Sequence, residues 1–369
     1  MISYWEREYW YPKFDTVIVG SGIVGLTAAL SLVKAAPNMK VALIERAELP
    51  MGASTKNAGF ACFGTIGELL DDLKEQSRDD VVETVRMRWT GLELLKSNVP
   101  VEAMDYINQG GYEMLADESQ FLSYLDQLDR INGILEEATG HADTIKDMAY
   151  SSPPCFYHKA FFNPYESQLN PAKMIAFLLN KLKSAGVTLI NGMEILDFEP
   201  GPAIHIIGRS GMHIKTSKLL LCTNAFTNRL LDMADIVPAR NQVLVSNKLK
   251  ELPWKGCFHY DRGYVYFRDI DGRILLGGAR NIDLEAETTD NFGSNKKVED
   301  HLEGLLRNIC PDHEIFVEYR WSGIIASGKS KKPIIRKVDD NIVAAVRLGG
   351  MGVAIGSHVG ERGAGLILS

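Results

Sequence analysis

The sequence predicts a mixed α/β (α+β) protein in which a parallel, nucleotide-type sheet is interleaved with an antiparallel sheet. Two observations predict this fold class. Residues 17–25 (VIVGSGIVG) consist of a buried strand that runs into closely spaced glycines and then into an apolar helical stretch. Beyond residue 238, short β-branched and aromatic runs surround turn signals such as Asp271-Gly272, a pattern that is typical of antiparallel hairpins.

The glycines of the first unit have the spacing of a dinucleotide-binding turn. Gly20 allows the tight turn, Gly22 lets the backbone approach a pyrophosphate, and Gly25 lets the helix pack close to the strand. The N-terminus of that helix offers free N–H groups to phosphates. A second strand at 40–44 ends on Glu45, whose carboxylate can accept hydrogen bonds from ribose hydroxyls and would repel a 2′-phosphate. These residues predict a Rossmann-like βαβ unit that holds an ADP moiety.

Composition excludes several classes of partner. The chain has 369 residues, of which 46% are hydrophobic and 24% charged, enough for one large domain or two. The net charge is −7, and no basic patch with interleaved aromatic residues is present, so we expect no nucleic-acid partner. No apolar run has the length of a membrane span, and no signal peptide is evident. The five cysteines form no C-x-x-C pair and are expected to be reduced thiols in a cytoplasmic protein.

Residues 1–13 form a separate N-terminal aromatic arm. This arm contains Tyr4, Trp5, Tyr9 and Trp10. We expect it to pack on the protein's own surface, because exposed aromatic rings are costly in water; shallow insertion into a bilayer interface is the alternative.

Further segments follow the glycine unit in a characteristic order. Residues 52–59 (GASTKNAG) look like a G-x-S-x-x-N-x-G loop, and 238–242 (PARNQ) look like a P-x-R-G-Q segment with Asn241 in place of glycine. Residues 349–352 (GGMG) look like a C-terminal glycine loop. Together with 163–171 and 223–225, they resemble the D-amino-acid-oxidase-like flavoprotein superfamily, which includes glycine oxidase, sarcosine oxidase and D-amino acid dehydrogenases. The resemblance covers nearly the whole chain.

This resemblance implies a Rossmann-like FAD-binding domain with an interleaved antiparallel-sheet substrate domain. The FAD-binding domain would be discontinuous, with segments 14–90, 155–237 and 326–369, and the substrate domain would contain 91–154 and 238–325. FAD would be bound non-covalently, since no cysteine matches a covalent attachment site. The implied FAD-binding residues are Gly20, Ser21, Gly22, Ile23, Val24, Gly25, Glu45, Arg46, Ala53, Ser54, Thr55, Asn57, Ala58, Gly59, Ile195, Thr223, Asn224, Gly349, Gly350, Met351, Gly352 and Val353.

The implied reaction is oxidation of the C–N bond of a small amine or amino acid by hydride transfer to flavin N5, followed by imine hydrolysis. Oxygen or another electron acceptor would reoxidise the flavin. The candidate catalytic residues are Tyr264, Arg280 and Lys56. Each has a structural alternative: a cross-strand packing ring for Tyr264, a strand-end surface charge for Arg280, and a solvated loop lysine for Lys56.

The chain departs from the amino-acid-oxidising pattern at three positions. Ile325 and Gly350 stand where carboxylate-binding arginines often occur, and Leu275 stands where sarcosine oxidases carry a lysine that activates oxygen. These departures leave other functions open: an enzyme of the same fold that oxidises a C–OH bond, a non-catalytic flavin-binding subunit, or an NAD-dependent dehydrogenase.

Two further features are expected to be structural. The histidines show no metal-ligand spacing, so no metal site is predicted, and His358 is expected to be a packed side chain. The basic run 329–332 (KSKK) is expected to be a solvated turn, with steering of acidic substrates as the alternative.

Overall fold

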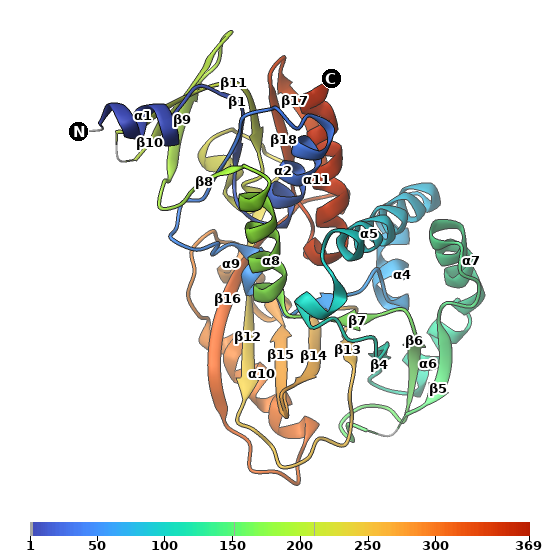
Figure 1. Ribbon diagram of the computed structural model, residues 1–369. Helices are drawn as coiled ribbons and strands as arrows, with labels where there is room; N and C mark the ends of the chain where they lie inside the picture. The colour runs from blue at the N-terminus through green and yellow to red at the C-terminus, as the bar shows by residue number, and fades with distance from the viewer. Residues whose placement is uncertain (1–2, 151, 210) are drawn as a thin grey trace.

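The computed structural model describes residues 3–150, 152–209 and 211–369, which form two eight-stranded sheets and their covering helices (Figure 1). The first sheet has the order β17-β18-β11-β1-β2-β8, with the hairpin β9–β10 attached to β11. Its strands are β1 (Phe14–Val19), β2 (Val41–Ile44), β8 (Thr188–Ile190), β9 (Ile195–Glu199), β10 (Ile204–Gly208), β11 (His213–Leu221), β17 (Ile334–Asp339) and β18 (Ile342–Val346).

The centre of the first sheet is parallel. β1 pairs in parallel with β2 and β11, β2 with β8, and β11 with β18. β2 and β18 are buried along their whole length, which is typical of parallel strands covered on both faces. Two helices, α2 (Ile23–Ala35) and α11 (Gly352–Leu368), pack together against this sheet, and α5 (Arg78–Asn98) packs on α11.

The second sheet has the order β16-β12-β15-β14-β13-β4-β6-β5 and is antiparallel except for the β4–β13 pair. One of its strands, β6, comes from the 155–237 stretch that was predicted to belong to the FAD-binding domain. The domain boundaries stay a prediction. The strands are β4 (Gly111–Met114), β5 (Lys146–Ala149), β6 (Lys159–Asn163), β12 (Val237–Ser246), β13 (Cys257–Tyr260), β14 (Val265–Ile270), β15 (Arg273–Gly278) and β16 (Val317–Ser327).

Alternation along these strands separates two faces of the second sheet. One face, with Phe258, Phe267 and Leu244, packs against the helix α10 (Lys296–Ile309). The opposite face carries Val243 and Tyr266 towards the first sheet. A short ladder, β3 (Phe60–Ala61) with β7 (Ser167–Gln168), lies beside that face. The two sheets therefore enclose a space between them.

Apolar residues at helical spacing in the sequence predict one helix over 68–98 and another over 118–138. In the structure each stretch is divided in two. The stretch 68–98 forms α4 (Ile66–Glu75) and α5, because the Ser77 hydroxyl accepts a hydrogen bond from the Asp80 N–H and begins a new helix. The stretch 118–138 likewise forms two helices. The remaining helices are α1 (Tyr4–Trp10), α3 (Ala53–Lys56), α6 (Glu118–Leu125), α7 (Leu128–Thr139), α8 (Pro171–Ser184) and α9 (Leu284–Glu287), with 3-10 turns η1 (Val101–Met104), η2 (Asn224–Arg229) and η3 (Arg280–Asp283).

Residues 4–10 of the N-terminal arm do not pack on the protein surface, so the prediction is wrong for them, whereas Tyr11 is partly buried against the core of the first sheet. The arm forms helix α1, which has no buried residue, and Trp5 and Tyr9 remain 77% and 78% exposed. Its helical order comes from a capping box between Ser3 and Glu6. Figure 1 shows α1 projecting beyond the first sheet. Among the described residues, no helix has the length and apolar character of a membrane span.

Deleting residues 1–10 is expected to leave the thermal unfolding midpoint within about 2 °C of the full-length value, because the described part of this segment buries no side chain. Differential scanning calorimetry of the two proteins checks this. A drop of more than about 5 °C would show that the arm packs on the domain after all.

Candidate cofactor and substrate site

A cavity of about 560 Å³ lies between the two sheets. Its wall contains all but three of the residues predicted to bind FAD. The exceptions are Gly25, Thr55 and Gly59, which lie behind the wall. Gly25 permits the contact of α2 with the turn, Thr55 Oγ1 donates to the Pro50 carbonyl oxygen at 2.8 Å, and Gly59 adopts a φ of +77°.

One end of the cavity fits a pyrophosphate and a ribose. Gly20 has a φ of +107°, and a Cβ on Gly22 would lie 2.8 Å from Ser54 Oγ, so side chains are excluded here. The Glu45 carboxylate is buried and accepts hydrogen bonds from both the N–H and the hydroxyl of Ser21. The N-terminus of α2 has no side-chain cap at Gly22. This combination offers N–H donors to phosphate oxygens and an acceptor to ribose hydroxyls.

The neighbouring region fits a planar base. Arg46, Ile195 and Thr223 line it, together with Phe226 and Arg229, which the sequence analysis missed. Both guanidiniums lie over the Phe226 ring, with Arg46 Cζ 3.9 Å and Arg229 Cζ 5.1 Å from its centroid. Burial, and secondarily the charge of Arg229, lowers the pKa of Arg46. Arg46 was among the residues predicted to bind FAD, but its aromatic partner Phe226 comes from a segment far away in the sequence.

The opposite end of the cavity presents a second helix N-terminus. Gly349 and Gly350 have φ values of +60° and +86°, and α11 begins directly after them without a side-chain cap. Uncapped N–H groups at the start of a 17-residue helix stabilise negative charge. This is the environment that a reduced flavin pyrimidine requires. The Ile23 N–H of α2 donates to the Ser54 hydroxyl at 3.0 Å, whereas the N-terminus of α11 has no side-chain cap. The two helix starts and the glycine cradle therefore fit an extended dinucleotide.

Comparison with known proteins agrees with this geometry. Residues 15–366 match the family model "FAD dependent oxidoreductase" (DAO). The chain belongs to the DAO family of FAD-dependent oxidoreductases. It is therefore an FAD-dependent enzyme, and its fold class is the predicted one.

Solved structures of similar fold include three with different substrates in their names. Iminodiacetate oxidase from Chelativorans sp. BNC1 superposes with a TM-score of 0.77 at 19% identity, covering 96% of this chain and 95% of that one. Glycine oxidase from Geobacillus kaustophilus gives 0.75 at 17% identity, with 96% and 95% covered. L-proline dehydrogenase from P. horikoshii gives 0.75 at 20% identity, with 97% and 94% covered.

A local similarity points to another relative. A stretch of 49 residues is 49% identical to the mitochondrial L-2-hydroxyglutarate dehydrogenase of Caenorhabditis briggsae. The match spans 13% of this chain and 11% of that protein.

The three predicted catalytic residues all border the cavity, but they do not gather at one point. The Arg280 guanidinium lies over the Tyr264 ring, 5.4 Å from its centroid. The Lys56 ammonium lies over Phe292 instead, 5.6 Å from that ring. Among the described residues, no acidic side chain pairs with Arg280, whereas its neighbour Arg262 pairs with Asp261 and Asp71. Arg280 is thus a cation available to an anion in the cavity.

The basic run 329–332 was predicted to be a solvated turn, and for Lys331 this prediction is wrong. Lys331 Nζ lies 2.6 Å from an Asp72 oxygen and 3.0 Å from a Glu68 oxygen. Glu68 also pairs with the buried Arg88. Although burial raises it, the two cations lower the pKa of Glu68 to about 2. The run therefore ties the loop after β16 to α4, and these charges neutralise one another beside the cavity.

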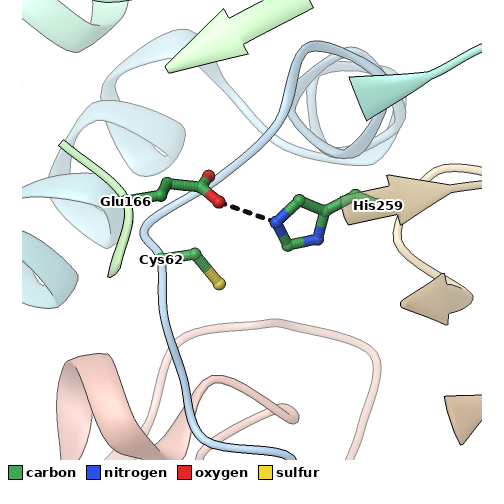
Figure 2. Close-up of side chains that lie close together, drawn as sticks. All are labelled: Cys62, Glu166 and His259. Atoms are coloured by element: carbon green, nitrogen blue, oxygen red, sulfur yellow. Dashed lines mark hydrogen bonds and ion pairs between the residues drawn. The ribbon is translucent and has the colours of Figure 1, made fainter. Parts of the chain in front are cut away.

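The sequence analysis also missed a buried cluster at the cavity wall (Figure 2). His259 Nε2 lies 2.7 Å from a Glu166 carboxylate oxygen. Cys62 lies beside the pair, and the potential ligand atoms of the three residues all lie within 4.8 Å of one another. No spacing motif could reveal a cluster drawn from positions 62, 166 and 259. The alternation of Cys257-Phe258-His259 does place His259 opposite the core-facing Phe258.

A second buried carboxylate, Glu113, lies near this cluster and accepts a hydrogen bond from the Gly67 N–H at 3.1 Å. Burial raises the pKa of Glu113 to about 7. Between about pH 4.5 and 7, the Glu113 carboxyl is therefore protonated in the folded protein but ionised in the unfolded chain. The free energy of unfolding decreases as the pH rises through that window.

The substitution Glu113→Gln is expected to increase the free energy of unfolding at pH 8 by roughly 3 kcal/mol, because glutamine carries no charge to bury. At pH 4.5 and below, the two proteins are expected to unfold at similar denaturant concentrations. Urea titrations at both pH values check this. Equal destabilisation by the variant at both pH values would contradict a proton held by Glu113.

Proposed function

We propose that the enzyme oxidises the C–N bond of a small amino acid, with FAD bound non-covalently, and releases an imine that hydrolyses to an oxo acid and ammonia. The observation that carries this proposal is Arg280, a cation without an acidic partner among the described residues, which borders the cavity beside Tyr264. An arginine in that setting recognises a carboxylate through paired N–H donors.

The position of Arg280 offers a substitute for the missing family arginine. Ile325 lines the cavity and lies near Gly350, where a Cβ would be 3.6 Å from Ile325 Cδ1. This wall is apolar, so it does not hold a carboxylate. Arg280 follows β15, so the carboxylate binds at the end of β15, and the substrate carbon projects from there into the cavity.

When bound, FAD supplies the acceptor for the hydride that leaves the substrate carbon. The chain's own residues bind and orient the reactants. Glu45 and the N-terminus of α2 hold the ADP part, and the N-terminus of α11 stabilises charge on the flavin. Phe60 and Tyr266, whose ring centroids are 5.5 Å apart, provide an apolar surface that keeps water away from the reacting carbon.

A second candidate is oxidation of a C–OH bond in a small hydroxy acid. The local 49-residue similarity to an L-2-hydroxyglutarate dehydrogenase favours it. A carboxylate anchor such as Arg280 serves either substrate, because α-amino and α-hydroxy acids share the carboxylate. Either oxygen or another acceptor could reoxidise the flavin; Leu275, at the position of the oxygen-activating lysine, is buried and uncharged. A cytoplasmic location stays a prediction.

Product analysis separates the two candidates. The purified protein is incubated with panels of amino acids, amines and hydroxy acids and an artificial electron acceptor, and ammonia and oxo acids are quantified. The proposal expects ammonia and oxo acid in a one-to-one ratio from an amino acid. Oxo acid from a hydroxy acid alone would support the second candidate. No product from any panel, with FAD bound, would support a non-catalytic flavin protein.

A further inference from the structure

The His259–Glu166 pair lies between the large cavity and the protein interior. His259 is on β13, and its ring forms part of the cavity wall together with Phe60 and Tyr266. Its side chain is only 7% exposed, and that of Glu166 is 1% exposed. A polar pair that is buried to this extent and still borders a substrate cavity is a candidate for proton transfer.

The hydrogen bond defines which ring nitrogen can act. An ionised carboxylate only accepts hydrogen bonds, so Nε2 of neutral His259 carries the hydrogen and donates it to Glu166. Nδ1 then keeps its lone pair. Figure 2 shows this second nitrogen on the side of the ring away from Glu166. The pair has the arrangement of a base whose tautomer and orientation are held by a carboxylate.

Charges around His259 favour its protonated form. The acidic groups near it are Glu166, Glu113 and Glu68, and the last of these is neutralised by Arg88 and Lys331. Burial lowers the pKa of His259, but the three carboxylates outweigh burial, so that the pKa lies above its usual range. On the cavity side, Arg262 and Arg280 are among the cations that line the wall.

Cys62 contributes no charge to this arrangement. Burial and the nearby Glu166 raise the pKa of its thiol well above the usual value, so it stays protonated. The potential ligand atoms of the three side chains lie within 4.8 Å of one another, and two of them, Glu166 and His259, are joined by a hydrogen bond.

We propose that Nδ1 of His259, held in place by Glu166, takes the proton from the substrate heteroatom during oxidation. The inference rests on the proposed function, since it needs an oxidisable substrate. An α-ammonium gives up one N–H proton to His259, the carbon-bound hydrogen leaves with its electron pair to the bound FAD, and a C=N bond forms. A hydroxy acid would lose its O–H proton in the same way and form a C=O bond. Glu166 balances the resulting imidazolium, which then releases its proton to water in the cavity.

The state of the pair can be measured without substrate. The full-length protein with bound FAD is labelled with ¹⁵N-histidine, and His259 is assigned by the resonance that disappears in the variant His259→Gln. We expect neutral His259 to carry hydrogen on Nε2 and to titrate above the usual histidine range. Glu166→Gln should lower that pKa, because the imidazolium loses its anionic partner. A neutral His259 with hydrogen on Nδ1 would overturn the proposal.

The catalytic role is tested by anaerobic stopped-flow reduction of the flavin over a range of pH. His259→Gln should slow reduction by about 10²–10⁴-fold at saturating substrate, while Glu166→Gln should move the acidic limb of the rate profile to lower pH. His213→Gln, at an exposed position on β11, serves as the matched control and should react like the wild type. FAD content and thermal midpoint establish that the variants are folded.

Three further outcomes would overturn the proposal. In the first, substrate reduces the flavin of the wild type and of His259→Gln at the same rate at every pH. This result would show that His259 is not the base, and it would leave the proposed function intact. One equivalent of metal in the purified wild type, lost in both His259→Gln and Cys62→Ala, would make the cluster a metal site. Wild-type flavin that no substrate reduces would contradict both the proposed function and this role.

Discussion

Replacing Arg280 by methionine is expected to raise the KM for an anionic substrate by roughly 10- to 100-fold, which corresponds to about 1.5–3 kcal/mol for a hydrogen-bonded charge. Methionine keeps an unbranched apolar stem beside Tyr264 but removes the guanidinium that lies 5.4 Å from that ring. FAD should bind as in the wild type, because Arg280 is not among the residues predicted to bind it. Steady-state kinetics with the best carboxylate substrate and with its uncharged amide check this.

The amide comparison identifies what Arg280 recognises. With the amide, the KM values of the wild type and of Arg280→Met should differ little, because the amide has no carboxylate with which the Arg280 guanidinium could pair. Arg336→Met, at an exposed position on β17, is the control and should leave both KM values unchanged. An Arg280→Met variant with wild-type KM for the carboxylate would show that another group anchors the substrate, and Arg280 would then be a surface charge.

Replacing Gly25 by alanine is expected to abolish FAD binding and to lower the free energy of unfolding by roughly 2–3 kcal/mol. A Cβ at this position would lie 2.0 Å from the Gly20 carbonyl oxygen. Because the Gly20 carbonyl oxygen belongs to the backbone, the clash can only be relieved by moving α2 away from the turn at Gly20–Gly22 that precedes it. That movement would displace the N–H groups offered to the pyrophosphate. The visible absorbance of the purified protein and its FAD-to-protein ratio check this.

Gly133→Ala is a matched control for this substitution. Gly133 lies within α7, and nothing lies within 4 Å of a Cβ there. Alanine should leave FAD content unchanged and raise stability by up to about 1 kcal/mol, since glycine is a poor helix former. A yellow Gly25→Ala protein with wild-type stability would mean that the first βαβ unit tolerates a wider helix–turn separation than the structure implies.

The cofactor half of the site could be predicted from the sequence because its signals are local. Each of these features can be recognised from a few neighbouring residues: the turn at Gly20 and Gly22, the acid Glu45, and the glycines before α11. Their order along the chain then identified the family. The glycine-loop prediction at 349–352 needed no knowledge of tertiary contacts, because a positive φ and a helix start are encoded in the loop itself.

The substrate half depends on tertiary contacts, which the sequence does not report. His259, Glu166 and Cys62 come from three segments that meet where the β3–β7 ladder lies beside β13. Lys331 looked like a solvated charge because its partners on α4 lie more than 250 residues earlier. Lys56 was adjacent in sequence to predicted FAD contacts, yet its side chain leaves towards Phe292. The prediction for the arm failed for a different reason: aromatic composition favours burial, but residues 4–10 form a short helix, closed locally by the Ser3–Glu6 capping box, that buries no side chain.

The most direct test of the account is anaerobic titration of the purified, yellow protein with amino acids, amines and hydroxy acids while the flavin band near ~450 nm is recorded. We predict that a small amino acid bleaches the band stoichiometrically and that ammonia accumulates in the same cuvette. Admitting oxygen afterwards distinguishes an oxidase, which regains its colour at once, from a dehydrogenase. A band that no amino acid or amine bleaches would contradict the proposed C–N oxidation, even with FAD fully bound.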